Sequence, residues 1–490
     1  MLIAAVIVYL AVTIAIGVWA ANRVSSAKDF LVAGRHLPLY MTVATVFATW
    51  FGAETVLSVS ATFAKDGLGG IVADPFGSSF CLVFVALFFA RAFYRMDLLT
   101  IGDFYHKRYG KPVEVVTSVA ITASYLGWTS AQLTALGLVF HVLSKGALTL
   151  NEGILLGAAI VLAYTVMGGM WAVAWTDLFQ TVIIVIGLWM VAWLVADMAG
   201  GTGKVIAAAA EAGRFSFWPE GGSKEWLAFA ASWATLAVGS IPQQDVFQRV
   251  TSARNESIAV KGTLLGGMAY FVFAFVPIFI AYAALVVDPQ LAALFKADDA
   301  REIQFILPRF IEERVPLWAQ IMFFGALLSA ILSTASGALL APSALFTENV
   351  LRPFVPRMGD RQFLLTLRIV LVAFTLAALL FGLNSRSTMY EMVQNAYKVT
   401  MVGALVPLVA GLFWKRATAA GAMASILLGL STWMLMEAFV AGWFTAEPPK
   451  DTIWPTQFVG LGFAIVGMVL GSLATRGPVP PHHHPQAHRP

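Results

Sequence analysis

One apolar run of this sequence carries polar residues at a depth where they need a partner. In ATVFATWFGAETVLSVSATF, residues 44–63, Gly52, Glu54 and Thr55 lie near the middle of a segment long enough to cross a membrane. Gly52 weakens a helix by about 1 kcal/mol relative to alanine, and carbonyls freed by a helix break need a cation or water. The stretch predicts either a discontinuous helix at a binding site, or a kinked helix with a glutamate near the interface.

A second run carries hydroxyl groups at helical spacing. In GALLSAILSTASGALLAPSALF, residues 325–346, Ser329, Ser333 and Ser336 share one helix face, with Thr334 beside it. Hydroxyl oxygens among Ala and Gly suit a small hard cation such as Na⁺, because such ions prefer oxygen ligands. The same stripe of small residues is also typical of close helix packing.

A third run, GGMWAVAWTDLFQ at residues 168–180, places an acid at the start of an apolar segment. Asp177 lies there, and Gln180 follows about one helical turn later. Asp177 is either an ordinary interfacial cap or a ligand of an ion.

Two further features point to the same kind of site. AVGSIPQQDVFQRV, residues 237–250, interrupts an apolar run with Gly239 and Pro242 before charged residues follow. Trp50 and Trp128 lie inside apolar runs, where an indole can stack on a solute or hold an ammonium group by cation–π attraction. Packing and contact with lipid are the other uses of tryptophan at such positions.

The composition indicates what kind of protein positions these residues. Of 490 residues, 59% are hydrophobic and 12% are charged, about half of the roughly 25% usual in soluble domains. The mean hydropathy is +0.79. Because the apolar residues come in runs of about 20, each able to span a bilayer as a helix, we predict an all-α, polytopic membrane protein.

We expect about 13 transmembrane helices from the hydropathy pattern. They are predicted near residues 1–20, 40–63, 73–96, 113–141, 151–168, 174–199, 225–248, 260–286, 316–350, 362–383, 388–413, 417–441 and 455–475.

Basic residues set the expected orientation. Arg23, Lys28 and Arg35 follow the first run, which places that loop in the cytoplasm and the N-terminus outside. The first run has no basic segment before it, so we do not expect a cleaved signal. An odd number of spans puts the C-terminus in the cytoplasm, and we expect residues 476–490, rich in Pro and His, to be a disordered, solvated tail.

Several classes of function are disfavoured. The stretch GTGK lacks the full phosphate-loop pattern, so an ATP-driven pump or a hydrolase has no support, and we expect no enzyme. The net charge of +4 is explained by cytoplasmic loops and needs no nucleic acid as a partner. Cys81 is the only cysteine, which excludes an intramolecular disulfide.

Four of these stretches together resemble the sodium:solute symporter family. FATWFGAET resembles its first core helix, GGMWAVAWTDLFQ its fifth, IPQQDVFQRVTSA its sixth and SAILSTASGALLAPSALFTENV its eighth. The resemblance runs from about Asn22 to Arg416, and the motifs are nearest to the choline and proline-type branches.

The resemblance implies a LeuT-like core of two inverted five-helix repeats. It implies the following division: an extra N-terminal helix and cytoplasmic loop at 1–39, repeat one at 40–199, an extracytoplasmic loop at 200–224, repeat two at 225–413, two C-terminal helices at 414–475 and the tail.

The resemblance also implies an ion site. The sodium ligands would be the carbonyls of Ala48, Phe51 and Ala330 and the hydroxyls of Ser333 and Thr334. Asp177 and Ser336 would lie near a second cation position found in some members. This sequence departs there from the family, because members with a second sodium carry a hydroxyl where Gly337 stands.

By the same resemblance, the solute would contact Trp50, Glu54, Thr55, Trp128 and Gln243. Gln243 stands where the choline branch places a tryptophan, and Glu54 resembles a polar contact of sugar-transporting members. A carboxylate with two tryptophans suits a cationic or zwitterionic solute.

The expected function is a sodium-coupled symporter of an inner (plasma) membrane, which imports a small organic solute such as a choline- or proline-like compound by alternating access. Its partners would be that solute, the co-transported Na⁺ and the lipid bilayer. The alternatives are a membrane sensor that binds a solute, a passive channel or uniporter, and a symporter of a sugar or a carboxylate.

Overall fold

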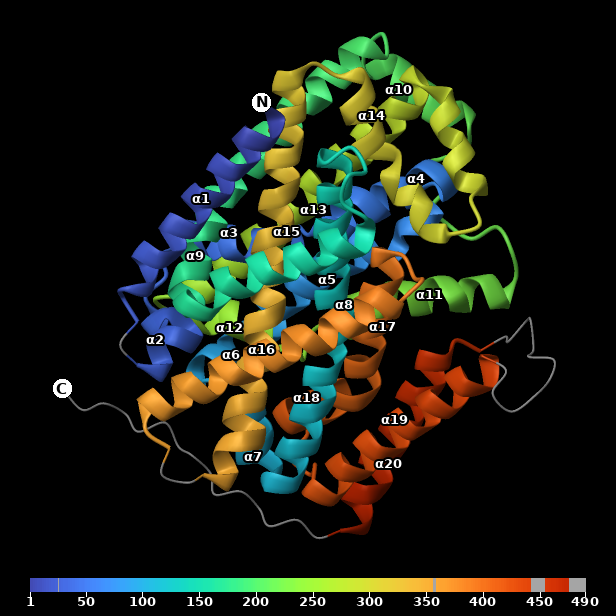
Figure 1. The fold of residues 1–490 in the computed structure, drawn as a ribbon. Helices are drawn as coiled ribbons and strands as arrows, with labels where there is room; N and C mark the ends of the chain where they lie inside the picture. Colours follow the sequence, from blue (N-terminus) through green and yellow to red (C-terminus); the bar gives the residue numbers. More distant parts are fainter. Residues whose placement is uncertain (25, 356–357, 442–453, 476–490) are drawn as a thin grey trace.

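The computed structural model describes residues 1–24, 26–355, 358–441 and 454–475, and Figure 1 shows their path. Within these residues every named element is a helix, and Leu37 and Ala253 form an isolated bridge. The predicted all-α class is confirmed. The predicted tail, residues 476–490, lies outside the described residues.

The α-helices are α1 (Leu2–Ala21), α2 (Ala27–Val32), α3 (Leu39–Trp50), α4 (Ser60–Asp66), α5 (Ser78–Phe84), α6 (Ala90–Arg95), α7 (Ile101–Tyr109), α8 (Lys111–Leu143), α9 (Leu150–Met198), α10 (Thr202–Glu211), α11 (Ser223–Ala237), α12 (Gln244–Thr251), α13 (Glu256–Val287), α14 (Ile306–Arg314), α15 (Leu317–Leu345), α16 (Asp360–Asn384), α17 (Met389–Thr400), α18 (Val406–Phe413), α19 (Ala419–Val440) and α20 (Thr456–Ala474). Two π-helical segments matter for the site: η2 (Glu54–Val59) and η4 (Val72–Gly77).

Ten helices of the described chain are long and apolar enough to cross a membrane, and α3 with the segment Glu54–Asp66 makes an eleventh span bent by 57°. The predicted count of 13 is therefore not confirmed. The predicted span 151–168 is a shorter apolar helix, Leu150–Ala163, in the part of α9 that precedes a kink at Gly169. The kink has a φ of +52°, a conformation that favours glycine.

The predicted span 225–248 folds as two short helices. Helix α11 ends at Ala237, and α12 begins only at Gln244. Pro242 lies in the interruption and has no backbone N–H to continue a helical ladder. Each half is too short to span a bilayer of about 30 Å alone, so neither is among the ten long apolar helices of the described chain.

The break between α3 and η2 lies where the sequence predicted it. Phe51 leaves helical geometry with φ −85° and ψ 75°, and Gly52 follows. A Cβ atom at Gly52 would lie 2.4 Å from Oε2 of Glu54, so only glycine allows the glutamate to fold back against the break. The sequence FGAE thus specifies both the break and the place of its carboxylate.

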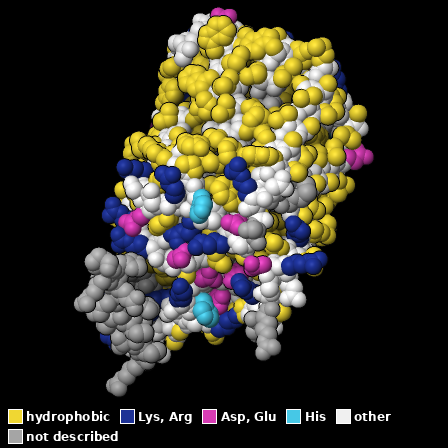
Figure 2. Space-filling model, turned by 90° about the vertical axis from the view of Figure 1, so that its left-hand side faces the viewer, with side chains coloured by type: hydrophobic (Ala, Val, Ile, Leu, Met, Phe, Trp, Pro, Cys, Tyr) yellow, Lys and Arg dark blue, Asp and Glu magenta, His cyan; other side chains and the backbone are white. Residues whose placement is uncertain are grey.

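Helix α15 is buried from Ala326 to its end, whereas α1 is mostly exposed and lies at the outer edge of the helices in Figure 1. Helix α15 packs against α9, α8 and α3, which places these four helices around one core. On the face shown in Figure 2, a broad hydrophobic region lies above a band in which Lys and Arg gather. This division is typical of a protein that spans a bilayer and keeps charges at its edge.

Candidate ion and solute sites

Oxygen atoms from three helices converge where α3 ends. The hydroxyl of Ser333 lies 3.0 Å from the carbonyl oxygen of Ala48 and 2.5 Å from Oδ1 of Asp177. The hydroxyl of Thr334 lies 3.3 Å from the Ala48 carbonyl oxygen and 3.2 Å from that of Thr49. All five residues are buried. We call this group of residues the oxygen cluster.

The helix break explains why two of these carbonyls are available. In a continuous helix the N–H groups of Gly52 and Ala53 would bond the carbonyls of Ala48 and Thr49. Instead, the Gly52 N–H donates to the Trp50 carbonyl at 3.1 Å, and the Ala53 N–H donates to Oε1 of Gln132 at 3.2 Å. The carbonyls therefore lack their helical partners and face the hydroxyls of α15.

Asp177 and Gln180 of α9 carry buried atoms with no hydrogen-bond partner. Within the described residues, Oδ2 of Asp177 and both polar atoms of the Gln180 side chain are unpaired. A buried polar group without a partner costs about 1–3 kcal/mol, and more if it is charged. A cation beside Asp177 would relieve part of this cost, so the chemistry of the cluster fits a small hard ion.

The other predicted ion ligands, Phe51, Ala330 and Ser336, lie in the same region, but their side chains do not belong to the oxygen cluster. Phe51 and Ala330 are buried, at the end of α3 and on α15. The hydroxyl of Ser336 donates to the carbonyl of Ser333 at 2.9 Å, in its own helix, and not to Asp177.

Gly337 faces a buried cation. A Cβ atom there would lie 2.6 Å from a terminal nitrogen of Arg249, so the guanidinium occupies the space that a side chain would need. Arg249 also donates from Nε to the hydroxyl of Thr49 at 2.9 Å. The departure from the family pattern at Gly337 thus coincides with a positive charge next to the oxygen cluster.

Glu54 is held on the other side of the break. Its carboxylate accepts hydrogen bonds from Nε2 of Gln132 at 2.6 Å and from Nε1 of Trp128 at 3.2 Å. Because Gln132 also accepts from the Ala53 N–H, one side chain of α8 fixes both the open backbone and the acid. The predicted residues Glu54 and Trp128 are therefore brought together.

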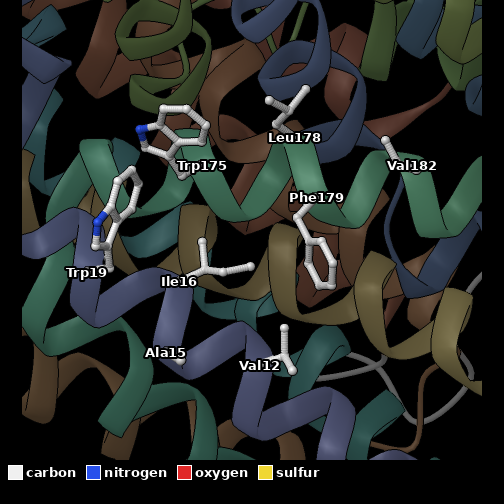
Figure 3. A pocket seen from close by; sticks show the side chains of 8 residues that line it. All are labelled: Val12, Ala15, Ile16, Trp19, Trp175, Leu178, Phe179 and Val182. Atoms are coloured by element: carbon white, nitrogen blue, oxygen red, sulfur yellow. The ribbon is translucent and has the colours of Figure 1, made fainter.

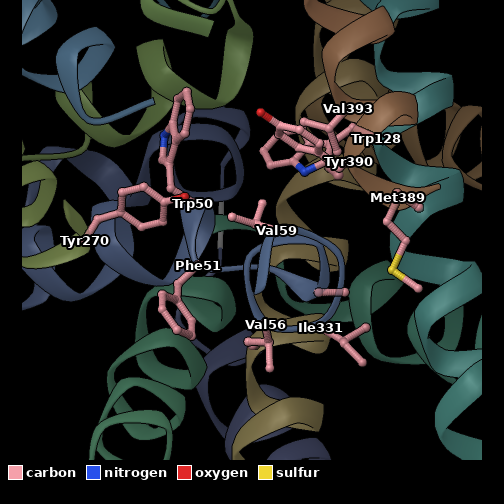
Figure 4. Close-up of a cluster of buried hydrophobic side chains, with 14 of the residues drawn as sticks. Trp50, Phe51, Val56, Val59, Trp128, Tyr270, Ile331, Met389, Tyr390 and Val393 are labelled. Atoms are coloured by element: carbon pink, nitrogen blue, oxygen red, sulfur yellow. The ribbon is translucent and has the colours of Figure 1, made fainter. Parts of the chain in front are cut away.

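Aromatic rings surround this carboxylate. Trp50 and Tyr397 lie nearly parallel, with ring centroids 6.0 Å apart, and Tyr397 lies 6.0 Å from Trp128. Tyr270 meets Trp50 edge to face at 6.5 Å. Figure 4 shows Trp50 and Tyr270 on one side of the η2 segment and Trp128 on the other.

A second buried acid, Asp74 of η4, lies beside this group and was not among the predicted site residues. The hydroxyls of Tyr270 and Thr55 donate to its two oxygens, the latter at 3.3 Å. Thr55, a predicted site residue, thus faces Asp74. The signal in the sequence was an acid inside the predicted span 73–96.

We call Glu54, Asp74 and the rings of Trp50, Trp128, Tyr270 and Tyr397 the aromatic enclosure. Neither acid makes an ion pair with any residue that the structure describes. A carboxylate buried in a membrane domain without a counter-ion is costly. The enclosure therefore favours a ligand that brings a positive charge.

Gln243, the last predicted solute contact, caps α12 at the second break. Its amide donates to the hydroxyls of Ser124 at 3.1 Å and Thr400 at 3.4 Å. Its Oε1 is buried and has no partner among the described residues. The second broken helix is thus tied by a side chain to α8 and α17, which carry Trp128 and Tyr397.

Comparison with known proteins agrees with this architecture. The family model of the sodium:solute symporter family matches residues 30–429. The chain belongs to this family. It is a multi-pass membrane transporter with a LeuT-like fold, and not an enzyme.

Two relatives show the range of the family. A high-affinity choline transporter 1 of Caenorhabditis elegans is 24% identical over 448 residues, covering 87% of this chain and 76% of the relative. A sodium/glucose cotransporter of Vibrio parahaemolyticus is 25% identical over 455 residues, covering 86% and 82%. Among solved structures, a Na⁺-coupled sialic acid symporter in a substrate-bound outward-open state has a TM-score of 0.76 at 19% identity, covering 97% of this chain and 98% of that one.

Proposed function

We propose that this transporter imports a small organic solute with a positive charge, such as a choline-like ammonium or a proline-like zwitterion, together with Na⁺. The observation that carries the proposal is the pair of buried acids, Glu54 and Asp74, without a basic partner among the described residues and among four aromatic rings. A cationic solute would neutralise that charge and be held by cation–π attraction. A solute with net negative charge would be repelled.

In this proposal Na⁺ binds in the oxygen cluster. The ion would take the place of the hydrogen bonds that Ser333 and Thr334 now make to the Ala48 and Thr49 carbonyls, and Asp177 would supply negative charge. Phe51 and Ala330 are proposed to add carbonyl ligands from the two sides of the cluster. Ser336 would lie beside the site without binding the ion, since its hydroxyl donates within α15.

Sodium would act on the solute site through the end of α3. An ion that ties the Ala48 and Thr49 carbonyls to α15 orders the last turn of α3, and Trp50 is the next residue. This places the indole against Tyr397 and sets the distance to Glu54. By linkage, the solute raises the affinity for sodium by the same factor as sodium raises the affinity for the solute.

Transport would follow by alternating access of two inverted repeats, residues 40–199 and 225–413. The broken span α3–η2 and the broken pair α11–α12 would be the first helix of each repeat, as expected for transporters with a site at discontinuous helices. The basic residues after α1 support an orientation with the N-terminus outside and the C-terminus in the cytoplasm, and a plasma or inner membrane is the proposed location.

A second candidate solute is an uncharged sugar. The observation that favours it is Oε1 of Gln243, a buried acceptor without a partner in the described chain, close to the hydroxyls of Ser124 and Thr400. A sugar hydroxyl could donate to it, and one of the relatives is a sodium/glucose cotransporter.

A thermal-shift screen of the purified protein tests both candidates. Choline, glycine betaine, proline, glucose and pyruvate are each added in sodium and in potassium, because a ligand of the folded state raises stability by mass action. We expect choline, betaine or proline to raise the melting temperature only in sodium. Stabilisation by glucose alone would select the sugar, and equal shifts in both salts would contradict sodium coupling.

Uptake into proteoliposomes then separates transport from sensing. The solute found in the screen should accumulate when an inward sodium gradient is imposed and should only equilibrate without one. A sensor would bind without uptake, and a uniporter would ignore the gradient.

A further inference from the structure

Arg23, just beyond the end of α1, lies over three indole rings. Its guanidinium carbon is 4.5 Å from the ring centroid of Trp19, 5.4 Å from that of Trp175 and 5.7 Å from that of Trp171. Arg23 is exposed, and it makes no ion pair within the part of the chain that the structure describes. A guanidinium whose face covers rings still presents its N–H donors at the edge.

The neighbouring basic residues differ from Arg23 because they form ion pairs with an acid. Lys28 and Arg35 both pair with Asp97, Lys28 at 3.4 Å. Arg23 therefore carries positive charge at the edge of the apolar region without an acidic partner among the described residues.

An apolar groove between α1 and α9 leads away from this arginine. It has a volume of about 570 Å³ and is lined by Val12, Ala15, Ile16, Trp19, Trp175, Leu178, Phe179 and Val182. Figure 3 shows Trp19 and Trp175 side by side at one end, with Val12 and Val182 further along.

A second cavity, of about 290 Å³, shares Val182 with the groove and continues along α1 to Ala5. The helix rise from Ala5 to Trp19 corresponds to about 21 Å. Because the hydrocarbon core is about 30 Å thick, the two cavities together are deep enough for an acyl chain of one leaflet.

A hydrogen-bond donor completes the end of the groove. Nε1 of Trp175 is buried and has no partner among the described residues, and its ring meets Trp19 edge to face at 5.3 Å. The indole N–H and the Arg23 guanidinium thus lie at the same end of the groove. A phosphate group accepts hydrogen bonds from such donors and gains from the positive charge.

We propose that the groove between α1 and α9 is a binding site for one anionic phospholipid. The headgroup phosphate would lie at Arg23 and Nε1 of Trp175, and an acyl chain would follow the groove toward Val182. A zwitterionic headgroup would bring an ammonium group next to a guanidinium that already occupies the faces of the three indoles. The site therefore prefers a lipid with net negative charge, such as phosphatidylglycerol, over phosphatidylcholine.

The site touches helices that also carry the oxygen cluster. Trp175 is two residues from Asp177 on α9, and the hydroxyl of Tyr9 on α1 lies 2.8 Å from that of Ser329 on α15. A lipid in the groove would brace α1 against both helices. The inference itself does not depend on the proposed solute or on sodium.

Binding of defined lipids to the purified full chain tests the proposal. Native mass spectrometry and thermal shift are measured with phosphatidylglycerol and with phosphatidylcholine of identical acyl chains, and with inorganic phosphate alone. One basic residue near a membrane surface contributes about 1 kcal/mol, so we expect the wild type to prefer phosphatidylglycerol about fivefold. Arg23→Gln should abolish this preference.

Three further variants make the result specific. Trp175→Phe keeps a ring but loses the N–H, so it should reduce the preference less than Arg23→Gln does. Ala15→Phe fills the groove and should weaken binding of both lipids. Arg361→Gln, a change at an exposed arginine in the first turn of α16, should leave the preference as in the wild type.

Four results would overturn the proposal. They are equal binding of both lipids by the wild type, an unchanged preference in Arg23→Gln, stabilisation by inorganic phosphate equal to that by the lipid, and a dimer that Ala15→Phe disrupts. The third would show a site for free anions, and the last would show that a second copy of the chain fills the groove. Equal melting of Arg23→Gln and wild type in phosphatidylcholine confirms that the variant folds.

Discussion

The oxygen cluster and the aromatic enclosure lie on either side of one helix break, and they consist of different chemical groups. The cluster uses two backbone carbonyls, two hydroxyls and one acid, from α3, α15 and α9. The enclosure uses only side chains, and these come from α3, η2, η4, α8, α13 and α17. Backbone oxygens do not depend on the side chain at their position, whereas the enclosure changes with every substitution of its residues.

The break frees backbone groups on both of its sides, and each region uses some of them. On one side, the Ala48 and Thr49 carbonyls are released toward α15. On the other, the released N–H of Ala53 is bound by Gln132, which also holds Glu54. The segment between them is only a few residues long, so we propose that ordering one side also orders the other.

The largest effect should come from removing charge in the enclosure. Asp74→Asn keeps the size of the side chain and an acceptor for Tyr270 but removes the negative charge. Hydrogen bonds to charged groups contribute about 1.5–3 kcal/mol, so we expect affinity for a cationic solute to fall roughly 10- to 150-fold. The dissociation constant of the solute in saturating sodium measures this.

Glu54→Gln sharpens the same test, because this acid is already bonded by Gln132 and Trp128. We expect Glu54→Gln to lower the affinity for the solute as well and to change which solutes the protein prefers. Sodium binding without solute should stay within about twofold of wild type, below the tenfold that 1.4 kcal/mol would give. If Asp74→Asn binds the solute as tightly as the wild type does, the enclosure does not hold a cation.

An intermediate effect is expected from the acid of the oxygen cluster. Asp177→Asn removes negative charge next to Ser333, so the sodium concentration for half-maximal uptake should rise about tenfold, equivalent to 1.4 kcal/mol. The order of preference among solutes should not change. Asp197→Asn, a change at an exposed acid further along α9, is the matched control. If both variants have the same sodium dependence, Asp177 is a structural residue and not an ion ligand.

The comparison also shows which features a single sequence can predict. The breaks at Gly52 and Pro242 were predicted, because they depend on local backbone chemistry. Helical periodicity grouped Ser333 with Ser329 and Ser336, whereas the family resemblance implied that Ser333 and Thr334 are ion ligands, and this stays a prediction. The fold class followed from hydropathy in the same way. The count of 13 spans was not confirmed, because the predicted spans 151–168 and 225–248 contain helices shorter than the roughly 20 residues that cross a bilayer.

The missing members of the enclosure have a different cause. Asp74, Tyr270 and Tyr397 come from helices that are far apart in the sequence, and only tertiary packing brings them together. No spacing rule connects them. Asp74 alone carried a local signal, as an acid in an apolar run, whereas buried tyrosines in apolar helices are ordinary core residues.

The smallest expected effect tests the hydroxyls of α15 against each other. Ser333, Thr334 and Ser336 are neighbours in sequence, but only the first two reach the α3 carbonyls. A neutral hydrogen-bonding group contributes about 1 kcal/mol, so Ser333→Ala or Thr334→Ala should raise the half-saturating sodium concentration about fivefold. Ser336→Ala should leave it unchanged, because that hydroxyl is bonded within its own helix. The melting temperature of all three variants is measured against sodium concentration without solute, so that solute binding in the enclosure does not affect the result. Ser336→Ala lowering the affinity for sodium as much as Ser333→Ala does would contradict this assignment. The ion would then lie further along α15 toward Arg249, and the α3 carbonyls would not be its ligands.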